Sequence, residues 1–235
     1  MSNEAPAPPT AFHWPPSARV NSLGGPLLIC DADAFPDWGG AGPDPYQDLD
    51  PACDYLRAWT AVHPDDDDLD TATVRFGPER QHTALIWETD GEASAEIALA
   101  ADSAAFLVMR SWIPRTWDGP RRRAARALPA EEQPAGTLDL PGGRAVVAWA
   151  AVAAADTRPA PEGRTATHLS LDVDGTSRIG AVLHVAPGAY RVTYGEQEGV
   201  RGRYLPADTP FASADDDWSC RWVRFTRTGP AAGGA

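Results

Sequence analysis

Residues 182–194 decide the fold class of this chain, and they read VLHVAPGAYRVTY. Pro187 and Gly188 suit the two central positions of a type II turn, because Pro fixes φ at the first position and Gly tolerates the positive φ of the second. This turn predicts an antiparallel hairpin whose arms are residues 182–186 and 189–194.

The second arm of this hairpin alternates along its length. Tyr190, Val192 and Tyr194 share one face, whereas Arg191 and Thr193 share the other. Segments of the same kind recur from residue 137 onward and predict further strands at residues 138–140, 145–152, 167–173, 179–185 and 220–226. One apolar face per strand indicates either a small sandwich or a sheet with a covering layer.

The N-terminal part mixes helix and strand signals. A short helix is predicted at residues 52–61, with Asp50 as its N-cap and Pro51 at the first helical position. Residues 94–105 are rich in Ala and favour a second helix, although residues 106–109 also suit a buried strand. Further strands are predicted at residues 26–30, 71–76 and 83–87. The predicted fold class is therefore α+β: a small N-terminal α+β unit followed by a predominantly antiparallel β segment.

The same patterns divide the chain into segments. The predicted order is a disordered Pro-rich tail at 1–17, an α+β region at 18–113, a linker or surface excursion at 114–136, a β-rich segment at 137–228 and a disordered tail at 229–235.

Composition and charge exclude several classes of function. All 20 basic residues are Arg, so lysine-dependent phosphate binding and Schiff-base chemistry are impossible. The net charge is −13 and no basic stripe is present, which predicts no nucleic-acid partner. The longest apolar run, residues 145–155, is too short to cross a bilayer, so no membrane partner is expected. Three cysteines without a CxxC pair indicate a cytoplasmic protein of a reducing compartment.

The sequence holds no complete set of catalytic or metal-binding residues. Asp31 and Asp33 follow an apolar strand, as in the DxD motif of haloacid-dehalogenase-type phosphohydrolases, but the βαβ pattern of those enzymes does not follow. The five histidines show no HExxH or other ligand spacing. We therefore predict a protein that is not an enzyme and that has no metal and no cofactor.

Charge is concentrated in one region of the chain. Residues 31–70 contain twelve Asp and one basic residue, Arg57, which gives −11 of the total charge, whereas residues 137–228 are nearly neutral. The densest part is the run Asp65, Asp66, Asp67 and Asp68. Two interpretations fit: a solvated face that maintains solubility, or a docking surface for a basic protein.

Short motifs in the N-terminal part resemble a known family. They are NSLGGPLL at residues 21–28, WGG at 38–40, DYLRA at 54–58 and FGPE at 76–79, with Thr83-Ala84 beyond. These stretches, within residues 19–113, resemble the immunity protein 21 family of bacterial polymorphic toxin systems. The family usually has a cysteine where Trp59 stands, and a proline expected near Arg80 is missing. The resemblance implies an α+β fold and neutralisation of a toxin, with no catalytic residues to transfer.

On this basis the expected partner is a cognate protein toxin, and a basic nuclease is the kind of toxin that suits an acidic surface. The residues predicted to bind it are Trp38, Asp54, Tyr55, Glu79, Asp65, Asp66, Asp67 and Asp68, with Trp38 as a buried anchor beside Gly39-Gly40. The residues expected to have structural roles are Arg57, Gly24, Gly25 and Pro26. The alternative function is a housekeeping β-rich ligand-binding or structural module, in which the face of Tyr190, Val192 and Tyr194 would line a pocket.

Overall fold

The computed structural model describes most of the chain. The described residues are 12–13, 19–22, 24–42, 50–64, 69–88, 93–112, 132–162, 166–171, 178–199 and 218–230.

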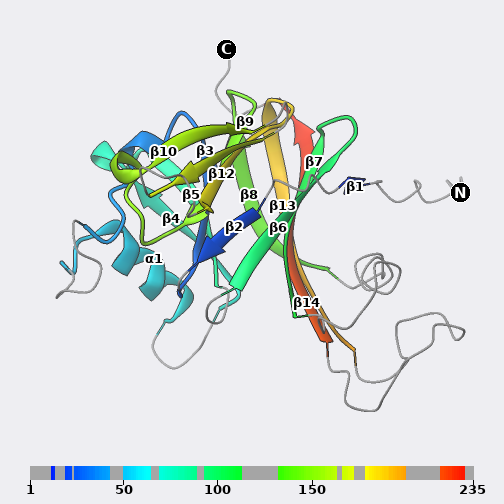
Figure 1. Ribbon diagram of the computed structural model, residues 1–235, viewed down its shortest axis with the longest axis horizontal. Coiled ribbons are helices and arrows are strands. Elements are labelled where there is room, and N and C mark those ends of the chain that lie inside the picture. Colours follow the sequence, from blue (N-terminus) through cyan, green and yellow to red (C-terminus); the bar gives the residue numbers. More distant parts are fainter. Residues whose placement is uncertain are drawn as a thin grey trace, which may run out of the picture.

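Two antiparallel sheets dominate the structure (Figure 1). Sheet I has the order β1 (Phe12–His13), β6 (Ala93–Ala100), β7 (Ala105–Trp112), β14 (Trp218–Gly229), β13 (Gly188–Gly199) and β8 (Glu132–Leu140), and β2 (Arg19–Ser22) also pairs with β6. Sheet II has the order β10 (Arg158–Glu162), β11 (Ala166–Ser170), β12 (Arg178–His184), β9 (Arg144–Trp149), β3 (Leu27–Asp31), β5 (His82–Trp87) and β4 (Thr71–Phe76). The helical elements described are α1 (Asp54–Val62) and the short 3-10 turns η1 (Phe35–Asp37), η2 (Pro78–Arg80) and η3 (Ala154–Asp156).

The chain is therefore a mainly β protein, and the α+β prediction needs correction. Residues 94–105 do not form a helix: most of them belong to β6 and the start of β7. β6 pairs with β7 on one side and with β1 and β2 on the other, so backbone pairing in the sheet outweighs the helix propensity of its alanines. The antiparallel character predicted for the C-terminal segment is confirmed.

The hairpin predicted around Pro187-Gly188 is wrong. Its first arm lies in β12 of sheet II, and its second arm lies in β13 of sheet I. The backbone N–H of Val185 donates to the carbonyl of Gly143 over 2.9 Å, and the N–H of Ala186 donates to the carbonyl of Ser103 over 2.8 Å. The turn therefore carries the chain from one sheet to the other.

The two sequence segments do not form separate sheets. Sheet I combines β6 and β7 with β8, β13 and β14, and sheet II places β9 beside β3. The end of the predicted linker is also part of a strand, because β8 begins at Glu132. Residues 114–131 of that linker lie outside the described residues, as does most of the predicted N-terminal tail.

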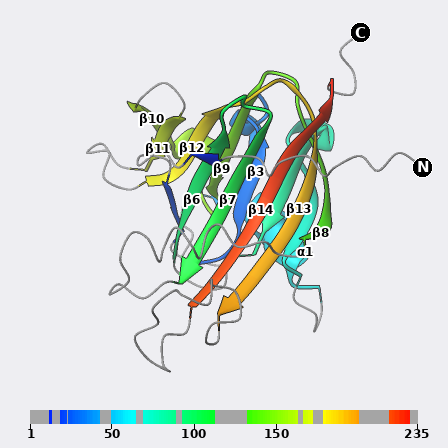
Figure 2. The ribbon, with the colours of Figure 1, turned by 90° about the vertical axis from the view of Figure 1, so that its right-hand side faces the viewer.

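The core lies between the two sheets. Tyr190, Val192 and Tyr194 of β13 are all buried in it together with side chains of sheet II. The ring of Phe106 stacks on Phe225 at 4.2 Å and meets Tyr190 edge-on at 5.8 Å between ring centroids. Figure 2 shows β6, β7, β14, β13 and β8 side by side, so this apolar layer spans the width of sheet I.

α1 lies against the edge of sheet II formed by β4, and it also contacts β5. Figure 1 shows the helix outside both sheets, on the far side of sheet II from sheet I. Within the part of the chain that the structure describes, no helix is long and apolar enough to cross a membrane.

Glu132 at the start of β8 ties three strands of sheet I together. Its carboxylate accepts hydrogen bonds from Trp222 Nε1 at 2.8 Å and Thr193 Oγ1 at 2.8 Å, and it pairs with Arg224 at 2.7 Å. We expect Glu132→Ala to lower the free energy of unfolding by about 2 kcal/mol, because it leaves the indole N–H and the guanidinium without their acceptor.

Chemical denaturation checks this prediction. Asp139→Ala is the matched control, since Asp139 is an exposed acid on the same strand. This substitution should change the free energy of unfolding by less than about 0.5 kcal/mol. Equal effects of the two substitutions would show that the Glu132 contacts do not stabilise the sheet.

Candidate functional site

The motifs that carry the family resemblance meet at one place in the structure, beside the N-terminus of α1. Gly39 donates its backbone N–H to Asp54 Oδ2 over 2.8 Å, and Tyr55 donates its backbone N–H to the carbonyl of Gly40 over 3.0 Å. We call residues 24–26, 37–40, 54–58 and 76–82 the motif cluster. Segments up to about fifty residues apart in the sequence therefore form one continuous unit.

Trp38 is the centre of this unit, and it is not available to a partner. Its side chain is only 1% exposed, its indole Nε1 donates to the carbonyl of Ala150 over 2.9 Å, and its ring meets Phe76 edge-on at 5.3 Å. The prediction that Trp38 anchors a partner therefore needs correction, because its surface is already covered by the core of this protein.

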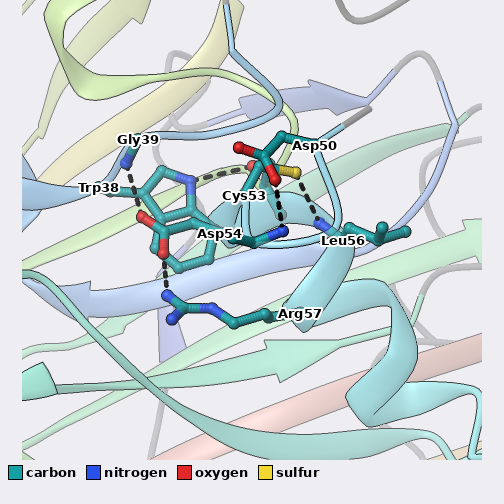
Figure 3. Close-up of polar contacts among 9 residues, drawn as sticks. Trp38, Gly39, Asp50, Cys53, Asp54, Leu56 and Arg57 are labelled. Atoms are coloured by element: carbon teal, nitrogen blue, oxygen red, sulfur yellow. Dashed lines mark hydrogen bonds and ion pairs between the residues drawn. The ribbon is translucent and has the colours of Figure 1, made fainter. Parts of the chain in front are cut away.

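Asp54 connects the start of α1 to the loop that follows η1 (Figure 3). One carboxylate oxygen accepts the hydrogen bond from Gly39, and the other pairs with the guanidinium of Arg57 in the same helix. A carboxylate in the first turn also interacts favourably with the helix dipole. Both Asp54 and Arg57 thus hold α1 in place, and Asp54 keeps only 13% of its side chain exposed for any partner.

The helix begins two residues later than predicted. Cys53, not Asp50, is the N-cap, and its Sγ accepts a hydrogen bond from Leu56 N at 3.4 Å (Figure 3). Asp50 instead accepts from Ala52 N at 2.8 Å in the turn that precedes the helix. The side chain of Asp50 therefore bonds within this turn.

Gly24, Gly25 and Pro26 form the turn before β3, and the turn is bonded to the end of β9. The indole N–H of Trp149 donates to the carbonyl of Gly24, and the backbone N–H of Ala150 donates to that of Pro26 over 3.1 Å. Gly25 has φ +78°, and a Cβ there would lie 2.6 Å from the hydroxyl of Tyr55. Glycine is therefore required at this position by both conformation and space.

Tyr55 is half-buried against this turn. Burial raises the pKa of its hydroxyl group, and the nearby acidic side chain of Glu88 and the thiol of Cys53 raise it further. The hydroxyl therefore stays neutral at physiological pH and remains able to donate a hydrogen bond. Its position between Gly25 and α1 gives Tyr55 a packing role in addition to any contact with a partner.

Glu79 and Arg80 form an exposed turn with an unusual backbone. Their φ angles are +52° and +54°, in the left-handed region that non-glycine residues rarely adopt. His82, which follows the turn, pairs with Asp37 of η1 at 2.9 Å. The ion pair thus ties the segment that carries this strained turn to η1. Glu79 itself is exposed, as a residue predicted to contact a partner must be.

We expect Glu79→Gly to raise the free energy of unfolding by about 0.5 to 1 kcal/mol. Relief of the left-handed strain gains about 1 to 2 kcal/mol, from which the extra backbone entropy of glycine subtracts about 0.5 to 1 kcal/mol. Glu79→Ala is the control in a denaturation experiment, because it removes the same charge but keeps the Cβ and should bring no gain. A Glu79→Gly protein less stable than the unmodified protein would contradict the presence of backbone strain at Glu79.

The exposed face of α1 includes an aromatic residue, Trp59, that was not among the residues predicted to bind a partner. Tyr55, Trp59 and His63 follow one another at four-residue spacing along the helix, and Trp59 is 38% exposed. The Asp65–Asp68 run, which follows α1 in the sequence, lies outside the described residues. The four-residue spacing of the rings could have revealed this face from the sequence.

Asp31 and Asp33 follow β3, but their surroundings differ from those of a phosphohydrolase. β3 lies between β5 and β9 and is antiparallel to both, so no βαβ unit exists here. Asp33 pairs with Arg144, and Asp31 accepts a hydrogen bond from the backbone N–H of Asp33 over 2.8 Å. Among the described residues, no group of three or more His, Cys, Asp or Glu side chains is placed to hold a metal ion.

Asp31 should make stability depend on pH. Burial raises the pKa of its carboxyl group, against backbone hydrogen bonds that favour the charged form, and the charge of Asp33 raises it further. The ionised group therefore destabilises the fold at neutral pH, and this penalty disappears as the pH falls through the raised pKa towards the ordinary value of about 3.9. Asp31→Asn lacks this charge, so its stability relative to the unmodified protein should be highest near neutrality and decline as the pH is lowered. Urea titrations at several pH values test this, and a pH-independent difference would contradict it.

Comparisons of the chain with protein-family models, curated proteins and solved structures find no match. The fold itself defines the class: a mainly β protein of two antiparallel sheets, with one α-helix among its described residues.

Proposed function

We propose that this chain is a non-enzymatic immunity-type protein that binds and neutralises a bacterial protein toxin. The observation that carries the proposal is the convergence of the GGP, WGG, DYLRA and FGPE motifs on one unit beside α1. Motifs that belonged to unrelated local turns would not be expected to contact one another. Their convergence supports the resemblance to the immunity protein 21 family on which the proposal rests.

The distribution of charge supports an acidic docking surface. Asp65–Asp68 follow α1 after His63 and Pro64, and the last turn of this helix contains no basic residue. Of the two interpretations of this run, the proposal takes the one in which it attracts a basic partner.

A basic toxin such as a nuclease would be blocked by occupation of its substrate site. Acidic side chains of this protein would take the positions that the phosphates of a nucleic acid otherwise occupy. Opposite charges on the two proteins would also accelerate association by about a hundred- to thousandfold over a neutral pair.

Co-expression in bacteria tests the proposal. The gene of an immunity protein lies beside that of its toxin, so the toxin domain encoded there is expressed alone or together with this chain. We expect growth arrest by the toxin alone, normal growth with this chain, and a complex that co-purifies. Absence of a toxin gene beside this one, or growth arrest that this chain does not relieve, would overturn the proposal.

The alternative was a housekeeping ligand-binding or structural β module, and its ligand-binding form loses the observation that favoured it. It required the face of Tyr190, Val192 and Tyr194 to line a pocket, but all three side chains pack in the core between the sheets. The hydroxyl of Tyr190 donates to the carbonyl of Ala186, and that of Tyr194 lies 3.2 Å from Glu196 Oε2. We therefore keep the immunity-type function as the single proposal.

A further inference from the structure

We propose that the partner docks on the outer face of α1 with Trp59 as its anchor, and that the surface it brings there is rich in Arg or Lys. The inference rests on the proposed function, and it specifies where the partner binds. The docking face consists of Trp59, His63 and Leu69.

Exposed apolar side chains are concentrated at this helix. Among the described residues, the large hydrophobic side chains that are exposed are Trp59, at 38%, and Leu69, at 43%. Leu69 is held at the C-terminal end of α1 because its backbone N–H donates to the carbonyl of Val62 over 2.7 Å. Single exposed hydrophobic residues are ordinary, but a Trp on α1 and a Leu held at the C-terminal end of this helix offer apolar surface that a partner can cover.

The indole of Trp59 is already held in position. Its ring stacks on His63 with centroids 4.0 Å apart and planes at 18°, and a His63 ring nitrogen lies 2.9 Å from the carbonyl of Trp59. Tyr55 flanks it on the preceding turn at 6.3 Å. A side chain fixed before binding loses little conformational entropy when it is covered, which is a property of good anchors.

The charge around this face selects a basic partner. Asp50, in the turn that precedes α1, is exposed. Arg57, the one basic residue between 31 and 70, is paired with Asp54. Arg and Lys suit such a surface because their charged ends lie among carboxylates while their aliphatic parts cover apolar side chains. Arg also packs favourably over an indole ring.

A nucleic acid does not suit this surface as a partner, and Trp38 does not suit the role of the anchor. The phosphates of a nucleic acid would be repelled by the charge of −11 carried by residues 31–70. Trp38, at 1% exposure, has no surface left for a partner. The outer face of α1 therefore replaces Trp38 as the place of the anchor.

Binding measurements with the full-length chain test the inference, with the purified toxin domain encoded by the neighbouring gene as the probe. Trp59→Ala should weaken the affinity at least about 30-fold, mostly through faster dissociation, and Leu69→Ala about three- to tenfold. Trp59→Phe, which keeps an aromatic ring, should retain most of the affinity. Thr60→Ala is the matched control, since Thr60 is exposed on the same helix and is not part of the docking face.

The possible results separate this inference from the proposed function. Tight binding of the unmodified chain with no loss in Trp59→Ala and Leu69→Ala would overturn the docking face but leave the immunity function intact. No binding by the unmodified chain would overturn both. Thermal denaturation shows whether each variant is folded. If Trp59→Ala is not folded, the affinities of Leu69→Ala and Trp59→Phe test the docking face instead. Unchanged affinity in Leu69→Ala would then overturn the docking face.

Discussion

Trp38→Ala is expected to lower the free energy of unfolding by about 3 to 5 kcal/mol, the usual cost of truncating a buried tryptophan. The substitution removes a side chain that is 1% exposed, its edge-on contact with Phe76 and its hydrogen bond to the carbonyl of Ala150. It also opens a cavity where η1, β4 and the end of β9 meet. Chemical denaturation followed by circular dichroism measures this loss.

Trp59→Ala is the matched control for this experiment, since it removes the same side chain from an exposed position. Its cost should stay near 1 kcal/mol or below, because Trp59 contacts Tyr55 and His63 on the helix surface. The two tryptophans should thus exchange roles between assays: Trp38 governs stability and Trp59 governs binding. Equal destabilisation by the two substitutions would show that the burial of Trp38 is incorrectly described.

Gly40→Ala is expected to cost about 3 to 4 kcal/mol, from left-handed strain and overpacking together. Gly40 has φ +57°, and a Cβ there would lie 2.4 Å from the backbone nitrogen of Ala153 and 2.7 Å from the carbonyl oxygen of Ala151. These are backbone atoms, and Ala151 also accepts a hydrogen bond from Ala41 N at 2.9 Å, so this segment cannot move aside cheaply. The loop after η1 would therefore separate from the turn after β9.

Gly42→Ala separates the two contributions. Gly42 has φ +92°, but a Cβ there would meet no atom within 4 Å. Only the conformational strain applies, so we expect a loss of about 1 to 2 kcal/mol. If Gly40→Ala is no more destabilising than Gly42→Ala in the same denaturation assay, Gly40 does not lie as close to the turn after β9 as described.

Individual strands could be predicted from the sequence where alternation and flanking turns agree. Residues 71–76 form β4 with the predicted bounds, and the strand predicted at residues 83–87 is β5 with one residue added. Pairing was predicted less well, because local turn chemistry does not say which strand lies beside which. Pro187-Gly188 is a turn, but the strands before and after it find partners in different sheets.

The prediction of a helix at residues 94–105 was wrong for a related reason. Alanine favours helices in isolation, yet the small side chains of β6 also suit a strand enclosed by β7 on one side and β1 and β2 on the other. Such enclosure depends on partners distant in the sequence, which composition does not reveal.

For the site, the sequence identified the segments that come together, but it did not separate buried from exposed members. The residues beside Trp38 and Trp59 do not reveal which of the two is buried, and only the three-dimensional arrangement places the first in the core and the second on the surface. The N-cap of α1 was also predicted at the wrong residue. Asp50-Pro51 is a strong local signal for a helix start, but the helix begins where Cys53 caps it and Asp54 can reach Gly39.

The central claim, that this chain neutralises a basic toxin by charge-steered binding, is tested most directly by association kinetics. The rate constant for association with the toxin domain encoded beside this gene is measured at low and at near-physiological salt. For the unmodified chain we expect fast association that slows steeply as salt increases. A variant with Asp65–Asp68 replaced by Asn should associate more slowly and with a weaker salt dependence, while its dissociation rate stays nearly unchanged. Failure of the toxin domain to bind, or an association rate that responds neither to salt nor to these substitutions, would contradict the claim.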